Sequence, residues 1–249
     1  MASRIRSDLT RRALLAAALL SVPVLARGQA TPLTIFAAAS LKPALDEIAT
    51  GWDGPLALSY GSSGALARQV ASGAPADVVL LAATDWMDWL AGQGAIAGGP
   101  VTIATNRLVL AGAPGGADVP LEADAILARL GASGRIAMGE PMSVPAGRYA
   151  QEALEQLGLW DALAPRMLYA EDVRAALAYV VRGDVPLGLV YGSDLVGTEA
   201  SVAAEIPAEA HDPISYPGAV VAGAATGAQA FLDHVAGARD VFARHGFLS

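Results

Sequence analysis

Four short stretches of the sequence place hydroxyl groups or bare backbone N–H groups where a strand is expected to run into a helix. They are centred on Ser40, Ser63, Ala146 and Val173. The first N–H groups of a helix have no partner within the helix, and the helix dipole places partial positive charge at that end. Helix starts therefore bind anions without a charged side chain. We predict that the four starts converge on one small oxyanion.

The two starts in the first half of the chain carry hydroxyl groups. Ser40 occupies an expected N-cap position and follows Ala37–Ala39, whose small side chains let a ligand approach the backbone. Ser63 lies in the stretch Gly61–Gly64, where glycines flank two serines. Hydroxyl and backbone donors are therefore expected together at both starts.

The two starts in the second half offer mainly backbone donors. Pro145 suits a first helical turn and has no N–H group, so the next free N–H groups are those of Ala146 and Gly147. Val173 follows Glu171 and Asp172, whose carboxylates suit the positive end of a helix dipole. We expect these carboxylates to point away from a bound anion.

A single helix start is weak evidence, because serine and aspartate are ordinary caps in any α/β protein. Four starts, two in each half, are more informative, because the strand ends of one sheet open into one crevice. Each helix N-terminus acts as roughly half a positive charge, so four would present about two charge equivalents, which suits a dianion.

Tyr191 lies at the end of a later strand. Either its phenol adds a hydrogen-bond donor to the site, or its ring packs beneath the strand end.

The N-terminal segment 1–30 has the pattern of a secretory signal peptide. Four arginines precede an apolar run from Ala13 to Ala26, and Gly28–Ala30 offers small residues for cleavage. The run is short for a membrane span, which needs about 20 residues. The stretch Thr10–Leu15 also resembles a twin-arginine export signal. We predict export to the periplasm without a lipid anchor, because the chain has no cysteine.

The charge and composition exclude several kinds of site. Removal of residues 1–30 takes away five arginines and one aspartate, which leaves 11 basic and 23 acidic residues and a net charge of −12. Such a chain has no broad basic patch for nucleic acid, and its overall field does not attract anions. Any anion site must therefore be local.

Alternating short strands and helices predict an α/β fold with largely parallel sheet, arranged as two lobes around a ligand cleft. We assign 31–110 plus 215–249 to lobe I and 111–214 to lobe II. The expected strands include Leu33–Ala38, Leu56–Tyr60, Asp77–Leu81, Leu187–Tyr191 and Ile214–Val221. The expected helices include Ser40–Thr50, one capped by Asp85, Ala146–Leu157, Val173–Val181 and a C-terminal segment from Gly227 to Arg244.

Six motifs in order resemble the periplasmic molybdate-binding proteins of molybdate ABC transporters. They are the stretches Phe36–Leu41, Ser62–Gln69, Gly73–Val78, Val144–Tyr149, Ala170–Arg174 and Gly188–Asp194. The resemblance covers essentially the whole chain after residue 30. One departure is Gly64, which stands where relatives often have a serine or threonine, so that one hydroxyl is missing.

The resemblance implies a type II periplasmic-binding-protein fold that closes on one tetrahedral oxyanion. By motif, the anion-binding residues are Ser40, Ser63, Ala146, Val173 and Tyr191. It implies molybdate or tungstate as the ligand, no cofactor, and molybdenum held only as the oxyanion without direct metal ligands. It also implies a membrane permease as partner. We further expect a monomer that binds no nucleic acid.

Two other classes of function compete with this interpretation. A carrier of another small tetrahedral oxyanion, such as sulfate, is compatible with the same helix starts. A serine hydrolase is disfavoured because the stretch Gly61–Gly64 is not the Gly-x-Ser-x-Gly elbow and the three histidines lie near the C-terminus. A metal-cation carrier is disfavoured because no His/Asp/Glu cluster has ligand spacing.

Overall fold

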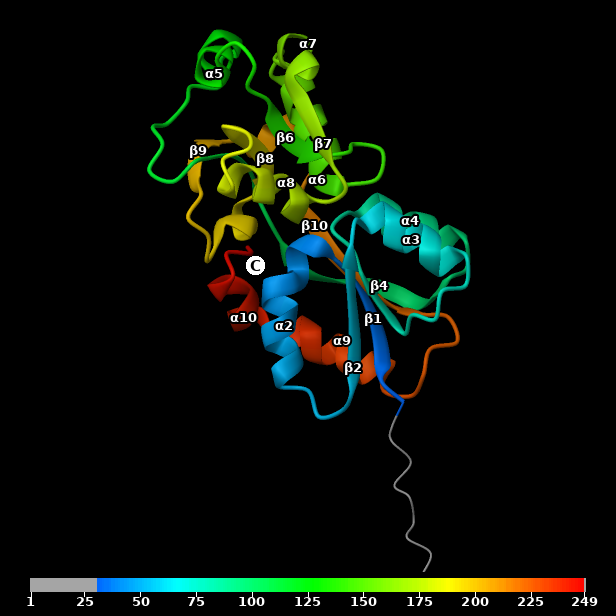
Figure 1. Ribbon diagram of the computed structural model, residues 1–249. Coiled ribbons are helices and arrows are strands. Elements are labelled where there is room, and N and C mark those ends of the chain that lie inside the picture. Colours follow the sequence, from blue (N-terminus) through cyan, green and yellow to red (C-terminus); the bar gives the residue numbers. More distant parts are fainter. Residues whose placement is uncertain (1–30, 249) are drawn as a thin grey trace, which may run out of the picture. The chain divides into compact units, whose positions relative to one another are not determined.

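The strands of the protein form two sheets in the computed structural model, which describes residues 31–248 (Figure 1). The first sheet has the order β2-β1-β3-β10-β4, made of β1 (Leu33–Ala38), β2 (Leu56–Gly61), β3 (Val78–Leu80), β10 (Ser215–Val221) and β4 (Ile96–Thr105). The second has the order β7-β6-β8-β5-β9, made of β7 (Met167–Ala170), β6 (Ile136–Gly139), β8 (Leu187–Tyr191), β5 (Leu108–Gly112) and β9 (Ser201–Glu205).

The two sheets have the same internal plan. In the first, β1 runs parallel to β2 and β3, and in the second, β6 runs parallel to β7 and β8. The other pairings are antiparallel, and they involve the strands on either side of the two crossings between the sheets, β4 to β5 and β9 to β10. The predicted α/β class is therefore confirmed, with mixed rather than largely parallel sheets.

Helices connect the parallel strands and cover the sheets. The α-helices are α2 (Lys42–Thr50), α3 (Ser63–Ala71), α4 (Thr84–Gly92), α5 (Ala123–Leu130), α6 (Pro145–Gln156), α7 (Trp160–Leu163), α8 (Val173–Val181), α9 (Ala228–Gly237) and α10 (Arg239–Arg244). Short 3₁₀ turns lie at η1 (Ala39–Leu41), η2 (Ala164–Arg166), η3 (Gly192–Leu195) and η4 (Ala208–Ala210). The last two helices pack on the first sheet's side, α9 against β4 and β10 and α10 against α2.

Two predicted helix caps are wrong. Ser40 lies inside the 3₁₀ turn η1, whose N-cap is Ala38 without a side-chain cap. Three small residues in succession let the chain turn tightly at the strand end, and the hydroxyl of Ser40 is used elsewhere. Asp85 lies in the first turn of α4, one residue after its start, and the N-cap is Ala83. The predicted C-terminal helical segment is divided into two helices at Ala238.

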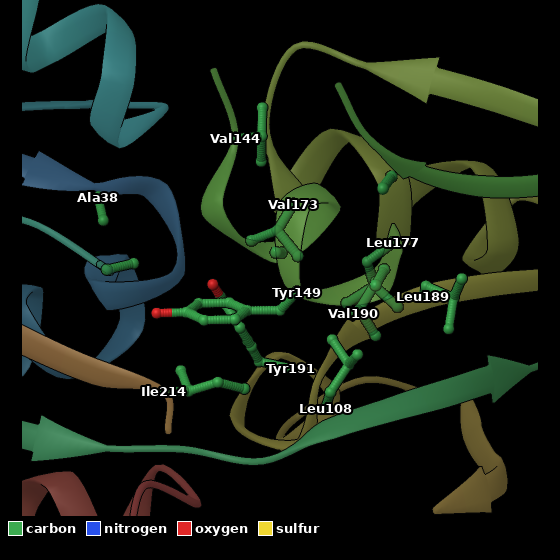
Figure 2. Close-up of a cluster of buried hydrophobic side chains, with 14 of the residues drawn as sticks. Ala38, Leu108, Val144, Tyr149, Val173, Leu177, Leu189, Val190, Tyr191 and Ile214 are labelled. Atoms are coloured by element: carbon green, nitrogen blue, oxygen red, sulfur yellow. The ribbon is translucent and has the colours of Figure 1, made fainter. Parts of the chain in front are cut away.

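Four of the six strands that lead to the pocket described below, and β5 beside them, are apolar and buried on both faces. All residues of β3, β5, β6 and β8 are buried, as are five of the six in β1. Strands that are covered on both faces have continuous runs of apolar residues in the sequence, so these strands could be predicted from the sequence. Figure 2 shows part of the core, in which Tyr149 and Tyr191 extend from the second sheet's side toward Ala38.

The residues from Pro32 onward pack as one unit. The chain passes from the first sheet to the second between Thr105 and Leu108 and returns between Glu205 and Ser215. The proposed lobe boundaries of 31–110 plus 215–249 and 111–214 remain a prediction. The predicted signal peptide, residues 1–30, lies outside the described residues. Among residues 31–248, no helix has the length and apolar character that crossing a membrane requires.

Candidate functional site

A small pocket lies where the carboxyl ends of six parallel strands meet, three from each sheet. From the first sheet it is lined by residues that follow β1, β2 and β3: Ala38, Ala39, Ser40, Gly61, Ser62, Ser63 and Ala82. From the second sheet it is lined by residues that end or follow β6, β7 and β8: Val144, Pro145, Ala146, Asp172, Val173 and Tyr191. The pocket therefore brings together all five predicted site residues.

The pocket is small for a binding site. Its cavity volume, counted as the space open to the centre of a water-sized sphere, is about 10 Å³. Ordinary small-molecule sites have about 300–1,000 Å³. The pocket thus suits a ligand the size of a small ion.

On the first sheet's side, Ser63 presents a hydroxyl with a defined direction. The N–H group of Ala82 donates to Ser63 Oγ over 2.9 Å. Because an incoming hydrogen bond occupies the oxygen, the hydroxyl proton of Ser63 is available to an acceptor in the pocket. The neighbouring Ser62 is the N-cap of α3, with its Oγ accepting from Ala65 N–H. Ser63 is fully buried, so its donor is shielded from bulk water.

On the second sheet's side, Ala146 and Val173 occupy the first turns of α6 and α8. Val173 is the first residue of α8, and Ala146 is the second of α6 after Pro145. N–H groups at these positions have no partner within the helix. The sequence suggested Gly147 as a further donor, but its N–H group donates to the carbonyl of Val144 over 3.0 Å. Ala146 therefore carries the donor of this helix start.

Tyr191 supplies the observation that points most directly to a ligand. Its side chain is 1 % exposed and lines the pocket. Its phenol oxygen is buried and has no hydrogen-bond partner among residues 31–248. Burial raises the pKa of the phenol well above its ordinary value, so Tyr191 keeps its proton at neutral pH. A buried donor without a partner is costly, and an anion in the pocket would supply the acceptor.

The lining of the pocket contains no cationic side chain. Of the described residues that line it, none is lysine, arginine or histidine. The one carboxylate in the lining belongs to Asp172, and its Oδ1 accepts from Ala175 N–H as the cap of α8. Apart from this capped carboxylate, the polar side chains of the lining are the hydroxyl groups of serine and tyrosine. Such an arrangement suits an anion that needs hydrogen bonds on each oxygen.

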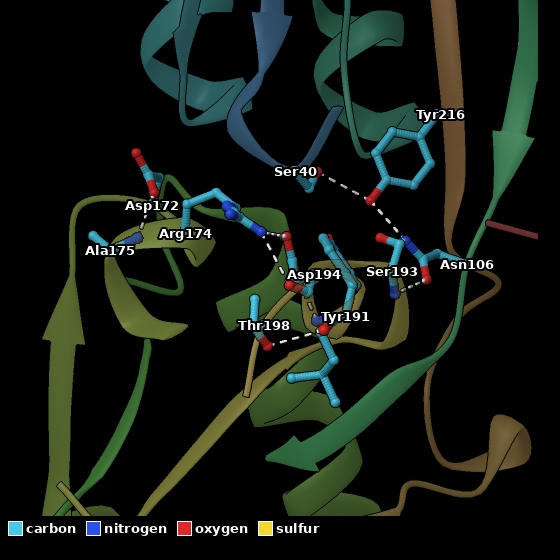
Figure 3. A network of polar contacts seen from close by, with 11 residues as sticks. Ser40, Asn106, Asp172, Arg174, Ala175, Tyr191, Ser193, Asp194, Thr198 and Tyr216 are labelled. Atoms are coloured by element: carbon cyan, nitrogen blue, oxygen red, sulfur yellow. Dashed lines mark hydrogen bonds and ion pairs between the residues drawn. The ribbon is translucent and has the colours of Figure 1, made fainter. Parts of the chain in front are cut away.

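A second carboxyl group, that of Asp194, is buried directly behind Tyr191. Its Oδ2 accepts from Tyr191 N–H over 3.1 Å, and its Oδ1 lies 3.7 Å from Arg174 Nη1 (Figure 3). Burial raises the pKa of Asp194 to about 7, although Arg174 and the Tyr191 N–H group act in the opposite direction. The second sheet's side therefore contains a titratable group near neutral pH.

Contacts between the elements of the two sheets surround the pocket. Gly64 N–H donates to the carbonyl of Ser143 over 3.0 Å, and Arg148 Nε lies 3.4 Å from Asp85 Oδ2. A Cβ atom at Gly64 would lie 2.6 Å from the ring of Trp86 and 2.8 Å from the Ser143 carbonyl. The glycine at this position thus permits close contact between α3 and the loop before α6. This explains why a hydroxyl-bearing residue is absent there.

Three residues that hold the serines were not found by sequence reasoning. Ala82 acts through its backbone, and Asn106 and Tyr216 form a buried chain of hydrogen bonds that ends at Ser40. Tyr216 lies 110 positions from Asn106 and 176 from Ser40, so only the fold brings them together. Asn106, at the crossing between β4 and β5, was the one available signal, because a buried asparagine in a short connection needs partners.

Comparisons with known proteins identify the family of this chain. Residues 33–248 match the family described as bacterial extracellular solute-binding protein. The chain belongs to this family. The solute-binding protein is 41% identical to the molybdate-binding protein ModA of Escherichia coli over 86% of its own length and 88% of the relative's. It is 36% identical to ModA of Haemophilus influenzae over 77% and 78% of the two chains.

Solved structures give the same result for the fold of this solute-binding protein. The periplasmic molybdate-binding protein of Azotobacter vinelandii matches with a TM-score of 0.77 and 25% identity over 87% of this chain and 99% of that one. The sulfate-binding protein SubI of Mycobacterium tuberculosis matches with a TM-score of 0.72 at 19% identity, over 87% and 86% of the two chains, which shows the fold alone. The predicted two-lobed binding-protein class and the prediction against an enzyme are confirmed.

Proposed function

We propose that this solute-binding protein captures molybdate, and also tungstate, as a tetrahedral dianion in the pocket described above. The observation that carries the proposal is the buried, unpartnered phenol of Tyr191 in a pocket whose other predicted ligands are helix-start N–H groups and serine hydroxyls. The names of the relatives from Escherichia coli and Haemophilus influenzae support molybdate as the ligand.

In this proposal five residues bind the anion. Ser40 and Ser63 donate through their hydroxyl and backbone N–H groups, Ala146 and Val173 donate through backbone N–H groups, and Tyr191 donates through its phenol. Molybdenum is bound only through the oxygens of the anion, and no protein atom ligates it. Among residues 31–248, no group of three or more His, Cys, Asp or Glu side chains is placed to hold a metal ion.

Two properties would set the selectivity of the pocket. Sulfate has the same charge and shape as molybdate but is smaller, so a cavity fitted to molybdate leaves sulfate with longer hydrogen bonds. Hydrogen phosphate carries a proton near neutral pH and needs an acceptor, which a ring of donors does not offer. We also propose that the closed complex docks on the membrane permease of an ABC transporter in the periplasm and that the protein acts as a monomer. Its membership of a solute-binding family supports the role in transport.

Calorimetric titration of residues 31–249 with molybdate, tungstate, sulfate and hydrogen phosphate tests this function. We expect tight one-to-one binding of the first two anions and no heat of binding from the last two. Equal binding of sulfate would assign the protein to a broader class of oxyanion carriers. Silence toward all four anions would show that the five residues do not form an anion site.

A further inference from the structure

The hydroxyl of Ser40 lies at the end of a buried chain of hydrogen bonds (Figure 3). Asn106 Nδ2 lies 3.1 Å from Tyr216 Oη, and Tyr216 Oη lies 3.1 Å from Ser40 Oγ. All three side chains are buried, with exposed fractions of 7%, 0% and 3% for Asn106, Tyr216 and Ser40. Asn106 lies in the crossing between the sheets, Tyr216 on β10, and Ser40 at the pocket, so the chain leads from the crossing to the ligand site.

The backbone fixes which way round the Asn106 amide lies. Its Oδ1 accepts from the N–H group of Arg107 over 2.9 Å and is 3.4 Å from the N–H group of Ser193. Two N–H groups on one side of the amide require the oxygen there. The NH₂ group must then face the other way, and its two protons are directed to Ser193 Oγ at 2.8 Å and to Tyr216 Oη.

The direction of the remaining hydrogen bonds follows from the number of protons. Tyr216 has one phenol proton and receives a hydrogen bond from Asn106, so it donates to Ser40. Burial raises the pKa of the Tyr216 phenol well above its ordinary value, which keeps that proton in place. Ser40 Oγ accepts from Tyr216, and its own proton is therefore free for the pocket that Ser40 lines.

We propose that Asn106 and Tyr216 are positioning residues that direct the hydroxyl proton of Ser40 into the pocket, so that the pocket favours anions that carry no proton. A serine hydroxyl otherwise adapts to its ligand, since it donates or accepts with equal ease. With one lone pair of its oxygen engaged by Tyr216 and its proton directed into the pocket, Ser40 is a poorer acceptor for the proton of a hydrogen phosphate or hydrogen arsenate ion. This inference rests on the proposed function and assigns its selectivity to two residues outside the pocket.

The same device holds Ser63 but is built from backbone. There the N–H group of Ala82 donates to the serine oxygen, and no side-chain substitution removes it. The chain that holds Ser40 is made of side chains, and mutation therefore tests it.

The first experiment replaces Tyr216 with phenylalanine. Titration of Y216F with molybdate should show an affinity about tenfold lower than that of the unmodified protein, the value of one directed hydrogen bond. The ratio of molybdate to hydrogen phosphate affinity should also fall, because Ser40 regains a free acceptor. The matched control is Tyr60→Phe, which removes a phenol hydrogen bond to Asp46 away from the pocket and should leave affinity and ratio unchanged.

A double-mutant cycle shows whether Tyr216 acts through Ser40. On a Ser40→Ala background, Tyr216→Phe should cause little further loss, because the group that it directs is already absent. Additive losses from the two substitutions would overturn the inference. Melting temperatures of the ligand-free variants, measured alongside, separate a loss of folding from a loss of donor direction.

The second variant, Asn106→Asp, reverses the chain while keeping the acceptor that Arg107 N–H uses. The new carboxylate accepts the Tyr216 proton, Tyr216 then accepts from Ser40, and Ser40 presents a lone pair to the anion. We expect N106D to bind molybdate at pH 8 at least about 100-fold more weakly, because it loses one donor and gains a repulsive contact. Binding as tight as in Y216F would contradict the predicted reversal.

The outcomes separate the two proposals. Silence of the unmodified protein toward all four anions would overturn the proposed function and this inference with it. Tight molybdate binding by the unmodified protein, with unchanged affinity and selectivity in Y216F, would overturn this inference alone.

Discussion

The first sheet's side of the pocket differs from the second sheet's side in how its donors are held. Ser40 and Ser63 present hydroxyl groups, and each hydroxyl oxygen receives a hydrogen bond from behind, from Tyr216 and from Ala82 N–H. Ala146 and Val173 present backbone N–H groups at the starts of α6 and α8, and these are donors by their nature. The proton of a hydroxyl group can rotate, so neighbouring groups decide where it points. The direction of a backbone N–H group is set by the backbone itself.

This difference has a consequence for where selectivity resides. Helix geometry determines the backbone donors at Ala146 and Val173, so side-chain changes at these two residues alter fit rather than polarity. On the first side, polarity depends on partners outside the pocket, such as Asn106 and Tyr216. Substitutions behind the first side of the pocket should therefore change which anion the pocket selects, whereas substitutions behind the second side should not.

The largest effect is expected from removing a backbone donor on the second side. Val173 is the first residue of α8, where proline is tolerated, and Asp172 before it is extended, with φ of −154° and ψ of 175°. V173P should keep the helix but lose the N–H group, and molybdate affinity should fall about 100-fold for one hydrogen bond to a charged ligand. Isothermal titration measures the loss.

The matched control for that variant is Val173→Ala, which keeps the N–H group and removes more of the buried side chain. V173A should bind molybdate within about threefold of the unmodified protein, although its melting temperature falls because core atoms are lost. An equal loss of affinity in both variants would assign the effect to packing and contradict the backbone-donor role.

A smaller effect is expected from Tyr191→Phe. Molybdate affinity should fall about tenfold, because one donor is lost. The ligand-free protein should become more stable by about 1 kcal/mol, because the variant no longer buries an unpartnered hydroxyl. Titration and thermal unfolding without ligand give the two values. A loss of ligand-free stability would mean that the phenol has a partner within the protein.

A dependence of folding stability on pH is expected from the second side of the pocket and not from the first. Burial raises the pKa of Asp194 from 3.8 to about 7 in the folded state. The folded protein then holds a proton that the unfolded chain releases, so the contribution of Asp194 favours folding below about pH 4 and is lost as pH rises to about 7. Melting temperatures from pH 4 to 8 should fall more steeply in the unmodified protein than in Asp194→Asn. Parallel curves would contradict this assignment.

The smallest effect is expected from the ion pair between the two sides. Arg148 and Asp85 are 33% and 50% exposed, so solvent screens their attraction. Asp85→Asn should weaken molybdate binding by no more than about fivefold at low salt, and the difference should vanish at about 1 M salt. A salt-independent loss would show that Asp85 has a role other than charge pairing.

The sequence located those elements whose patterns are local. Strands Leu33–Ala38 and Leu187–Tyr191 and helix Val173–Val181 match the structure at both ends, because each is an apolar run or an amphipathic stretch bounded by a clear signal. The start of the helix after Ser40 was misread because a 3₁₀ turn and an N-cap place a serine at nearly the same position. Strand β4 begins at Ile96 and runs through Gly98 and Gly99, a residue type that sequence patterns do not favour in strands.

The residue types at the pocket were determined by the sequence alone, since each strand end leads along the chain to a helix start that carries a serine, alanine or valine. The tertiary structure decided what these groups do. It brought Asn106, Tyr216 and Ser40 together across 176 positions, occupied the N–H group of Gly147, and buried the Tyr191 phenol without a partner. Donor geometry at a helix start is local, whereas the direction of a hydroxyl depends on partners that only folding can supply.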